Sequence, residues 1–475
     1  MAKPDTGSLS RLAMRSVVPI LVLGGLWVLP VPQGLPPQAW HMLAIFAAAI
    51  CAILTQPLPT GAVMIIALSV AALTRTLPLD KALSGFSNGV VWLIFCAYVL
   101  ALGFVKSGLG RRIAYRMLAW FGGSSLGIAY ALGITDLIIA PATPSVTARS
   151  GGIIFPVVRS INEALGSSPG PTGKRIGDFL TMVCFQFTPI TGAMFLTGMA
   201  ANPLVAALAH RSLKVDISWG HWFVAAAVPC AVCFLLMPQL VYRILNPSLK
   251  RTPEARELGR ESLARLGPMS GLEIRVVIGF VLALLGWGTS LLTGLDATLV
   301  GLVLVAYFFI TGSISWSDVL ADRAAWDTVI WFGAIISLAT GLSSLGFIKW
   351  MSMRFSADLA GWGAMTTFVV LGLCYIYVHY AFATASGHVA ALYVPFAALA
   401  VAAGAPPMMV AICFGIFSNL MWGNTEYGGG PGPIYFAQGY FGRPRFYAVN
   451  LAVVTSNVLI TFAVGMAWWK VIGLW

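Results

Sequence analysis

Eleven long apolar segments constrain the fold of this chain more than any other feature of its sequence. A helix needs about 20 apolar residues to cross the hydrocarbon core of a bilayer. Because 59% of the residues are hydrophobic and only 9% are charged, no soluble domain of appreciable size can form. The segments therefore predict an all-α polytopic membrane protein with eleven transmembrane helices. The expected spans lie near residues 17–31, 40–54, 60–74, 90–106, 179–209, 222–244, 276–293, 297–314, 328–349, 407–422 and 447–471.

Two further apolar segments, at about 125–161 and 366–403, are interrupted in the middle by polar and small residues. Each arm has about 15 residues, fewer than a crossing helix needs. Non-helical backbone at membrane depth is tolerated only where protein or a water-filled cavity satisfies its polar groups. We therefore expect two re-entrant hairpins, each made of a helix, a turn and a second helix.

The two interrupted segments are related by an internal repeat. The stretches "SVTAR" at 145–149 and "TASGH" at 384–388 share hydroxyl, hydroxyl, small and cationic positions, at an offset of 384 − 145 = 239. Pro156 and Pro395 have the same offset, 395 − 156 = 239. Each half would hold five crossings and one hairpin, so the second half enters the membrane from the opposite side. This is the inverted-topology repeat of secondary transporters.

The repeat divides the chain into four parts. Residues 1–35 form the N-terminal tail and first transmembrane helix, 36–245 the first repeat, 246–275 a basic linker, and 276–475 the second repeat. Cytoplasmic loops carry an excess of Lys and Arg, so we expect the linker and the N-terminus in the cytoplasm and the C-terminus in the periplasm. The net charge of +12 is explained by these loops; we expect a lipid bilayer, and no nucleic acid, as partner.

The hairpin tips have the chemistry of an anion site. Ser145 and Thr147 lie at the start of one half-helix, and Thr384 and Ser386 at the start of the other. Ser and Thr are good helix N-caps, and the first N–H groups of a helix have no intrahelical acceptor. Two such ends that face one cavity would bind a dianion with a carboxylate at each end.

Two basic residues lie one turn inside these half-helices, Arg149 and His388. Charge within a membrane is costly and points to function or to a partner. Arg149 either compensates the charge of a substrate or forms a structural ion pair with Asp136 in the other arm of its hairpin. His388 is either a cation with the same role or a neutral, hydrogen-bonded core histidine.

Two more apolar helices end in Gly, Pro, Thr and Asn, at 187–204 and 422–436, as expected of unwound helices that line a site. Within the second, Thr425 is a further candidate substrate contact. Glu426 is either an acid that couples a proton to transport or a carboxylate satisfied by backbone donors. Asp136 is the second candidate for coupling. The sequence contains no metal-ligand cluster and no Ser/His/Asp arrangement, so we expect no metal, no cofactor and no enzymatic activity.

Three motifs carry a family resemblance: "DLIIAPATPSVTARSGGIIFP", "HYAFATASGHVAALYVPF" and "EYGGGPGPIYFAQGYF". They resemble signatures of the divalent anion/sodium symporter family, in its branch of citrate/succinate, tartrate/succinate and 2-oxoglutarate/malate exchangers. The resemblance implies an eleven-span elevator transporter in a bacterial inner membrane. It also implies a homodimer and hairpin tips with Ser-Asn-Thr-type motifs that bind carboxylates. The family's basic side chains near the tips correspond to Arg149 and His388.

The chain departs from the family at three positions. Val146 stands where Asn is usual, Ala385 also lacks an amide, and Glu426 replaces the usual His. The loss of an amide removes a carboxylate donor and a sodium ligand. We therefore expect a sodium-independent antiporter of small di- or tricarboxylates with four to six carbons, such as succinate, malate, 2-oxoglutarate, tartrate or citrate. The alternative is a sodium- or proton-coupled dicarboxylate symporter.

Overall fold

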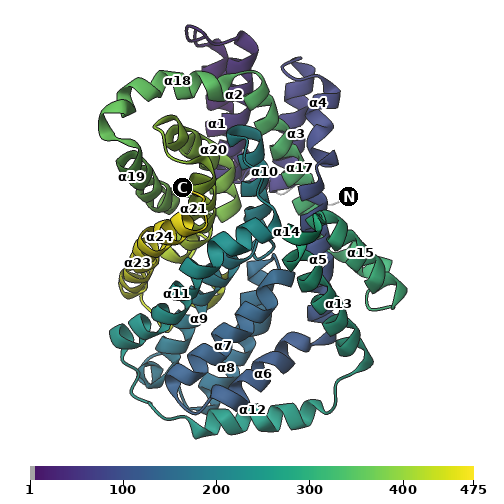
Figure 1. Ribbon diagram of the computed structural model, residues 1–475, viewed down its shortest axis with the longest axis vertical. Helices are drawn as coiled ribbons and strands as arrows, with labels where there is room; N and C mark the ends of the chain where they lie inside the picture. Colours follow the sequence, from purple (N-terminus) through teal and green to yellow (C-terminus); the bar gives the residue numbers. More distant parts are fainter. Residues whose placement is uncertain (1–5) are drawn as a thin grey trace.

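A computed structural model describes residues 6–475, with side chains from residue 12 onward except at 355–360. Over these residues the chain is built from helices and contains no β-strand (Figure 1). The predicted fold class, an all-helical chain with many apolar helices, is therefore confirmed.

Every predicted span coincides with a helix or a pair of helices. By length and apolar composition alone, nine helices of the described chain could cross a membrane. Three shorter apolar helices accompany them, at Leu12–Val28, Thr60–Leu73 and Ala297–Ile310. The number of crossings stays a prediction. The helices at the predicted spans are α1 (Thr6–Val28), α2 (Pro37–Thr55), α3 (Thr60–Leu73), α5 (Gly89–Ser107), α9 (Gly177–Met194), α10 (Ala201–Leu213), α11 (Trp219–Leu245), α13 (Gly271–Gly288), α15 (Ala297–Ile310), α17 (Arg323–Ser344), α21 (Pro407–Leu420), α23 (Arg443–Ile460) and α24 (Met466–Val471).

Both interrupted segments form a helix, a short break and a second helix. In the first, α7 (Ser125–Ile139) leads through a 3₁₀ turn and an irregular tip into a π-helical stretch, Thr147–Ile154, and then α8 (Phe155–Ala164). In the second, α19 (Ala364–Tyr377) leads through a 3₁₀ turn into α20 (Ala385–Ala402). Three arms are longer than the 15 or so residues expected. They are Ser125–Ala142, Ala364–Ala381 and Ala385–Ala402, with 18 residues each, and all three are among the nine helices of the described chain that are long and apolar enough to cross a membrane.

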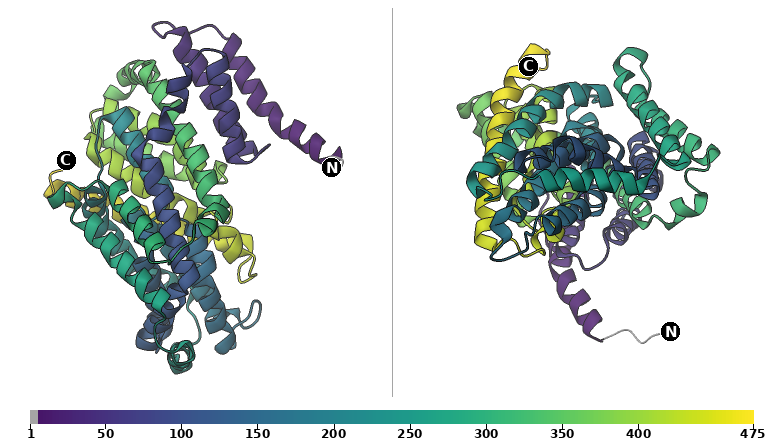
Figure 2. Two further views of the ribbon diagram at one scale, coloured as in Figure 1. Left: turned by 90° about the vertical axis from the view of Figure 1, so that its right-hand side faces the viewer. Right: turned by 90° about the horizontal axis from the view of Figure 1, so that it is seen from below.

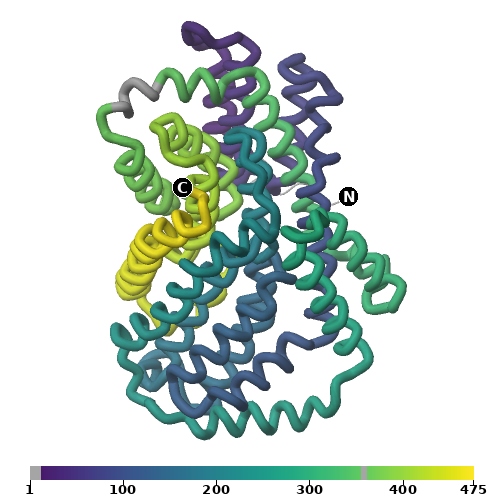
Figure 3. Tube along the Cα trace, viewed as in Figure 1, coloured from purple at the N-terminus to yellow at the C-terminus, as the bar shows by residue number. Residues whose placement is uncertain are grey.

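The two hairpins enter the molecule from opposite ends. Figure 1 shows α7 and α8 rising from the end that carries α6 (Leu109–Phe121), and α19 and α20 descending from the end that carries α18 (Phe347–Leu359). The Cα trace in Figure 3 shows the same arrangement, with α6 at one end and residues 347–354 at the other. The breaks of both hairpins therefore lie in the interior.

Two other helices are broken beside the hairpins, as the sequence predicts. The chain is non-helical between α9 and α10, and again between the 3₁₀ turn after α21 and α22 (Pro431–Phe436). The first break is tied to the first hairpin tip, because the backbone N–H of Ala200 donates to the Pro144 carbonyl over 3.1 Å. Thr197 Oγ1 also donates to the Pro141 carbonyl over 2.6 Å.

The polar linker contains a helix that lies outside the apolar bundle. Helix α12 (Pro253–Leu266) packs along α6 at one end of the molecule (Figure 1). Arg112 on α6 forms an ion pair with Glu273 on α13, with 2.6 Å between Nε and Oε1.

The first helix, α1, packs against α2 and projects from the body of the molecule (Figure 2). The remaining short helices are α4 (Leu79–Leu83), α14 (Ser290–Thr293) and α16 (Trp316–Ala321).

Candidate functional site

The tips of the two hairpins line one cavity of about 180 Å³. Six of the seven residues predicted to contact substrate contribute to its wall: Ser145, Val146, Thr147, Thr384, Ala385 and Ser386. These residues belong to two hairpins that enter the molecule from opposite ends, and the two sets are more than 230 residues apart in sequence. The other lining residues are Tyr98, Pro144, Met199, Ala200, Trp422, Gly429 and Gly430.

A hydroxyl group caps the start of the helix at each tip. Thr384 Oγ1 accepts a hydrogen bond from the Gly387 N–H over 3.1 Å, in the N-cap position of α20. Ser145 Oγ accepts from the Ala148 N–H over 3.2 Å. Because the first N–H groups of each helix have no acceptor within the helix, both tips offer hydrogen-bond donors and a partial positive charge. The wall of the cavity is therefore suited to anionic oxygen atoms at two separate points.

Two aromatic residues of the cavity wall were not predicted from the sequence. Tyr98 belongs to α5, and Trp422 to the 3₁₀ turn after α21. Trp422 is fully buried, and its indole N–H has no hydrogen-bond partner in the structure. A buried donor of this kind is costly to leave unpaired, so the cavity wall contains one indole N–H whose hydrogen bond is not supplied by the protein. The only sequence signal was its place within the unwound segment.

The glycine run that follows Trp422 allows three close contacts. A Cβ atom at Gly428 would lie 2.6 Å from His379 Nε2, and one at Gly429 would lie 2.7 Å from the Trp422 ring. A Cβ atom at Gly430 would clash with Thr147 at the first tip. Each glycine therefore lets the backbone approach a different part of the site.

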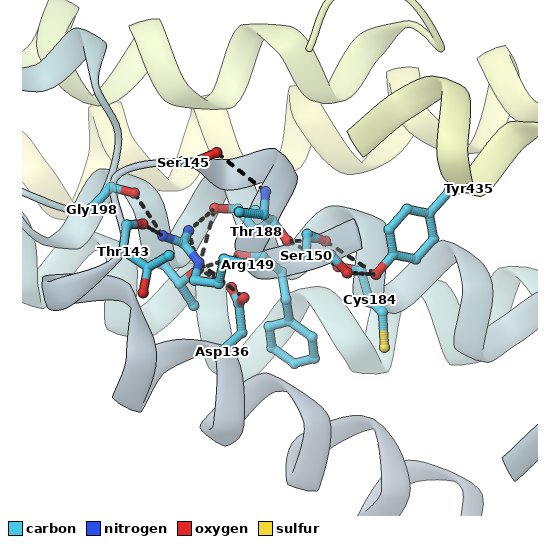
Figure 4. Close-up of polar contacts among 12 residues, drawn as sticks. Asp136, Thr143, Ser145, Arg149, Ser150, Cys184, Thr188, Gly198 and Tyr435 are labelled. Carbon is cyan, nitrogen blue, oxygen red and sulfur yellow. Dashed lines mark hydrogen bonds and ion pairs between the residues drawn. The ribbon is translucent and has the colours of Figure 1, made fainter. Parts of the chain in front are cut away.

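Arg149 does not line the cavity, because its guanidinium group is engaged within the protein (Figure 4). Its side chain is fully buried, and Nε lies 3.0 Å from Asp136 Oδ1. Nη1 donates to the carbonyl groups of Thr143, over 2.8 Å, and Gly198, over 2.7 Å. Thr191 donates to the same Asp136 carboxylate. Of the two alternatives for Arg149, the structure therefore shows the ion pair in which Asp136 neutralises it. Arg149 is not a free cation that faces the substrate cavity.

Arg149 joins three segments. It lies on the returning helix of the first hairpin, Asp136 on the other arm, and Gly198 in the break between α9 and α10. Its Nη2 is also within 3.4 Å of the Thr188 carbonyl on α9. The pair and its hydrogen bonds therefore hold the first tip in place beside the cavity.

His388 is also fully buried, with a different partner. Its Nδ1 lies 3.3 Å from Nδ1 of His379, a residue that the sequence does not single out. His379 Nε2 lies 3.1 Å from the Gly428 carbonyl oxygen. His388 Nε2 has no hydrogen-bond partner. The second tip therefore has an imidazole pair behind it where the first tip has an ion pair.

Thr425 and Glu426 lie apart from the cavity wall. Thr425 is buried, and its hydroxyl accepts the Gly428 N–H over 2.8 Å, which shapes the glycine run. Glu426 is paired with Arg443 on α23, with 3.3 Å between Oε1 and Nε. Among the described residues, no group of three or more His, Cys, Asp or Glu side chains could hold a metal ion.

Comparison with known proteins places this architecture among transporters. The sodium:sulfate symporter transmembrane region matches residues 10–475. YflS of Bacillus subtilis, named as a candidate malate transporter, is 40% identical over the whole of both chains. Dicarboxylate transporter 1 of Arabidopsis chloroplasts is 40% identical over 99% of this chain and 85% of its own. The inner membrane protein YbhI of Escherichia coli is 36% identical over 98% of both.

Solved structures share the fold at much lower identity. MtrF of Neisseria gonorrhoeae superposes with a TM-score of 0.59, at 14% identity and over 96% of this chain and 94% of its own. The YdaH transporter of Alcanivorax borkumensis gives a TM-score of 0.56, at 12% identity and over 92% and 99%. The match over almost the whole chain and the relatives at 40% identity show that this multi-pass membrane protein belongs to the sodium:sulfate symporter family of transporters.

Proposed function

We propose that the protein exchanges small di- and tricarboxylates of four to six carbons across a bacterial inner membrane, without sodium. The observation that carries this proposal is one cavity lined by two helix starts, which belong to hairpins that enter the molecule from opposite ends. A dicarboxylate such as succinate or malate has an anionic group at each end, which matches donors at two separate points. The names of the relatives, malate and dicarboxylate transporters, support the same substrate class.

The surroundings of Arg149 support sodium independence. A hard cation needs several oxygen ligands with free lone pairs. At the first tip, the carbonyl groups of Thr143 and Gly198 and the carboxylate of Asp136 already accept N–H groups of Arg149. Val146 and Ala385 also leave both tip motifs without the amide oxygen usual in the family. Because the positively charged guanidinium group lies among these oxygen atoms, a sodium ion bound to them would meet a like charge at close range.

Exchange follows from the charge and hydrogen bonding of the site. Moving a bare dianion into hydrocarbon would cost tens of kcal/mol by Born solvation, so the carboxylates must cross with donors paired to them. Without substrate, the donors of both tips are left unpaired, and the empty site crosses poorly. A carrier of this kind returns only when it is loaded, which couples export of one dicarboxylate to import of another.

The arrangement of the hairpins supports an elevator mechanism with two inverted repeats, 36–245 and 276–475. In this proposal eleven helices cross the membrane, the N-terminus lies in the cytoplasm and the C-terminus in the periplasm, and two copies form a homodimer.

The alternative function, a proton-coupled symporter, has one observation in its favour. Glu426 Oε2 is buried without a hydrogen-bond partner, so its carboxyl group has room for a proton.

Uptake into proteoliposomes tests the proposal. Vesicles are loaded with unlabelled succinate or left empty, and uptake of labelled succinate is followed with and without sodium and a pH gradient. We expect uptake only into loaded vesicles and at the same rate without sodium. Sodium-dependent uptake into empty vesicles would instead establish symport. Uptake into empty vesicles that requires only the pH gradient would assign coupling to a proton.

A further inference from the structure

The buried basic residues in the two halves of the site, Arg149 and His388, have different kinds of partner. The offset that relates Arg149 to His388 also relates Asp136 to Tyr375, since 375 − 136 = 239. The Tyr375 ring meets the His388 ring edge-on at 4.5 Å between centroids, and its hydroxyl lies 2.8 Å from Ser418 Oγ. His388 therefore lacks the carboxylate that its counterpart has.

The hydrogen bonds of the imidazole pair determine where its protons lie. A carbonyl oxygen can only accept, so His379 Nε2, 3.1 Å from the Gly428 carbonyl, must carry a hydrogen. A neutral imidazole has one N–H, which leaves a lone pair on His379 Nδ1. His388 Nδ1, 3.3 Å away, must then donate its hydrogen. In the neutral pair, His388 Nε2 is consequently a bare acceptor, and it has no partner.

We propose that His379 and His388 form a site for one proton, in which His379 holds His388 as the Nδ1–H tautomer and the proton enters at His388 Nε2. Protonation there keeps both hydrogen bonds and converts His388 into an imidazolium that still donates to His379. A second added proton would place two N–H groups against each other over the 3.3 Å that separates the Nδ1 atoms. The pair therefore takes up one proton and not two.

The pair is placed to act on the carboxylate at the second tip. His388 lies one turn beyond Thr384, and Gly428, which accepts from His379, precedes the lining residues Gly429 and Gly430. On the basis of the proposed function, a proton taken up here adds one positive charge behind the tip as the dianion binds. His379 is a positioning residue in this scheme, because it acts through His388.

Few other groups can influence this proton. In the part of the chain that the structure describes, the titratable side chains brought into contact with His388 are His379 and Tyr375. None of the ion pairs found there includes His388. Gly428 is required for the geometry, because a Cβ atom at this position would lie 2.6 Å from His379 Nε2.

Nitrogen NMR of the imidazole groups tests the tautomer directly. The chain has only five histidines, so ¹⁵N-histidine spectra can be assigned by single substitutions. We expect His388 with a hydrogen on Nδ1 and a bare Nε2, and His379 with a hydrogen on Nε2. On acidification one proton should appear, at His388 Nε2. The Nε2–H tautomer of His388 in the neutral pair would overturn the proposal. This measurement needs no transport, so it separates failure of the pair from failure of the proposed function.

Two substitutions separate the roles of His379. His379→Asn keeps an oxygen acceptor where Nδ1 lies, whereas His379→Gln keeps an N–H donor toward Gly428. Succinate exchange is measured between pH 5.5 and 8, with His221→Gln on an exposed histidine as control. We expect His379→Asn to keep the parent protein's dependence of exchange rate on pH. We expect His379→Gln to lose this dependence, and its exchange at low pH to be about tenfold slower than the parent's, which corresponds to the cost of one buried hydrogen bond. The reverse pattern, or equal behaviour of the two variants, would overturn the proposal.

Discussion

Replacing Asp136 with Asn removes one charge of the buried ion pair without changing the size of the side chain. Both partners are almost completely buried, with 0% of the Arg149 side chain and 2% of the Asp136 side chain exposed. The substitution leaves the carbonyl contacts of Arg149 in place, at Thr143 and Gly198. It therefore isolates the charge of Asp136 from the rest of the network.

The expected loss of stability is large. Removing one partner of a buried ion pair costs about 3–5 kcal/mol, because it leaves the other charge uncompensated. This corresponds to about two to four powers of ten in the unfolding equilibrium constant. The double substitution Asp136→Leu with Arg149→Met removes both charges, and replacing a buried pair with apolar residues is often neutral. We expect it to recover part of the loss, because Arg149→Met also leaves the buried carbonyl groups of Thr143 and Gly198 without their donor.

Unfolding of the purified protein in mixed micelles with a denaturing detergent, followed by tryptophan fluorescence, measures these free energies. Succinate binding to the folded variant is measured beside it by calorimetry. Because Arg149 is engaged away from the cavity, we expect Asp136→Asn to lower stability without tightening succinate binding. Unchanged stability, or markedly tighter binding by a freed Arg149, would show that Arg149 serves the substrate and not the hairpin.

Three further substitutions test the cavity wall. Gly429→Ala should cost about 1–3 kcal/mol by overpacking and slow exchange, because its Cβ would lie 2.7 Å from the buried Trp422 ring. Gly152→Ala, whose Cβ would meet nothing within 4 Å, is the control, and equal thermal unfolding of the two variants would contradict the packing argument. Trp422→Phe should weaken succinate binding about fivefold to tenfold by loss of the indole donor, and unchanged calorimetric affinity would exclude that role. Thr384→Ala should destabilise by about 1 kcal/mol through loss of the N-cap, with recovery in Thr384→Ser; a thermal midpoint equal to the parent's would argue against the cap.

The hairpins could be predicted because their signal is local. Polar residues interrupt apolar runs at the tips, and the predicted ends at 161 and 403 lie within three residues of those of α8 and α20. The pairing of Asp136 with Arg149 was also foreseeable as an alternative. The two residues lie at similar distances on either side of one turn, which places them opposite each other in antiparallel arms.

The remaining contacts depend on tertiary packing. Tyr98 reaches the cavity from α5, and nothing in its own apolar helix distinguishes it from its neighbours. His379 becomes a partner of His388 only because the 3₁₀ turn of the second hairpin brings their rings together. The sequence favours Glu426 as a candidate for proton coupling, yet the start of α23 supplies it with Arg443. Such pairings require the path of the backbone, which periodicity alone does not give.

The position of a bound dicarboxylate is the most direct test of the central claim. Cryo-electron microscopy of the protein with succinate or malate would locate the ligand relative to the two tips. We expect one carboxylate within hydrogen-bond distance of the residues around Ser145 and the other within reach of those around Thr384, with the Arg149–Asp136 pair intact. Ligand density away from either tip, or a carboxylate in contact with Arg149 in place of Asp136, would contradict it.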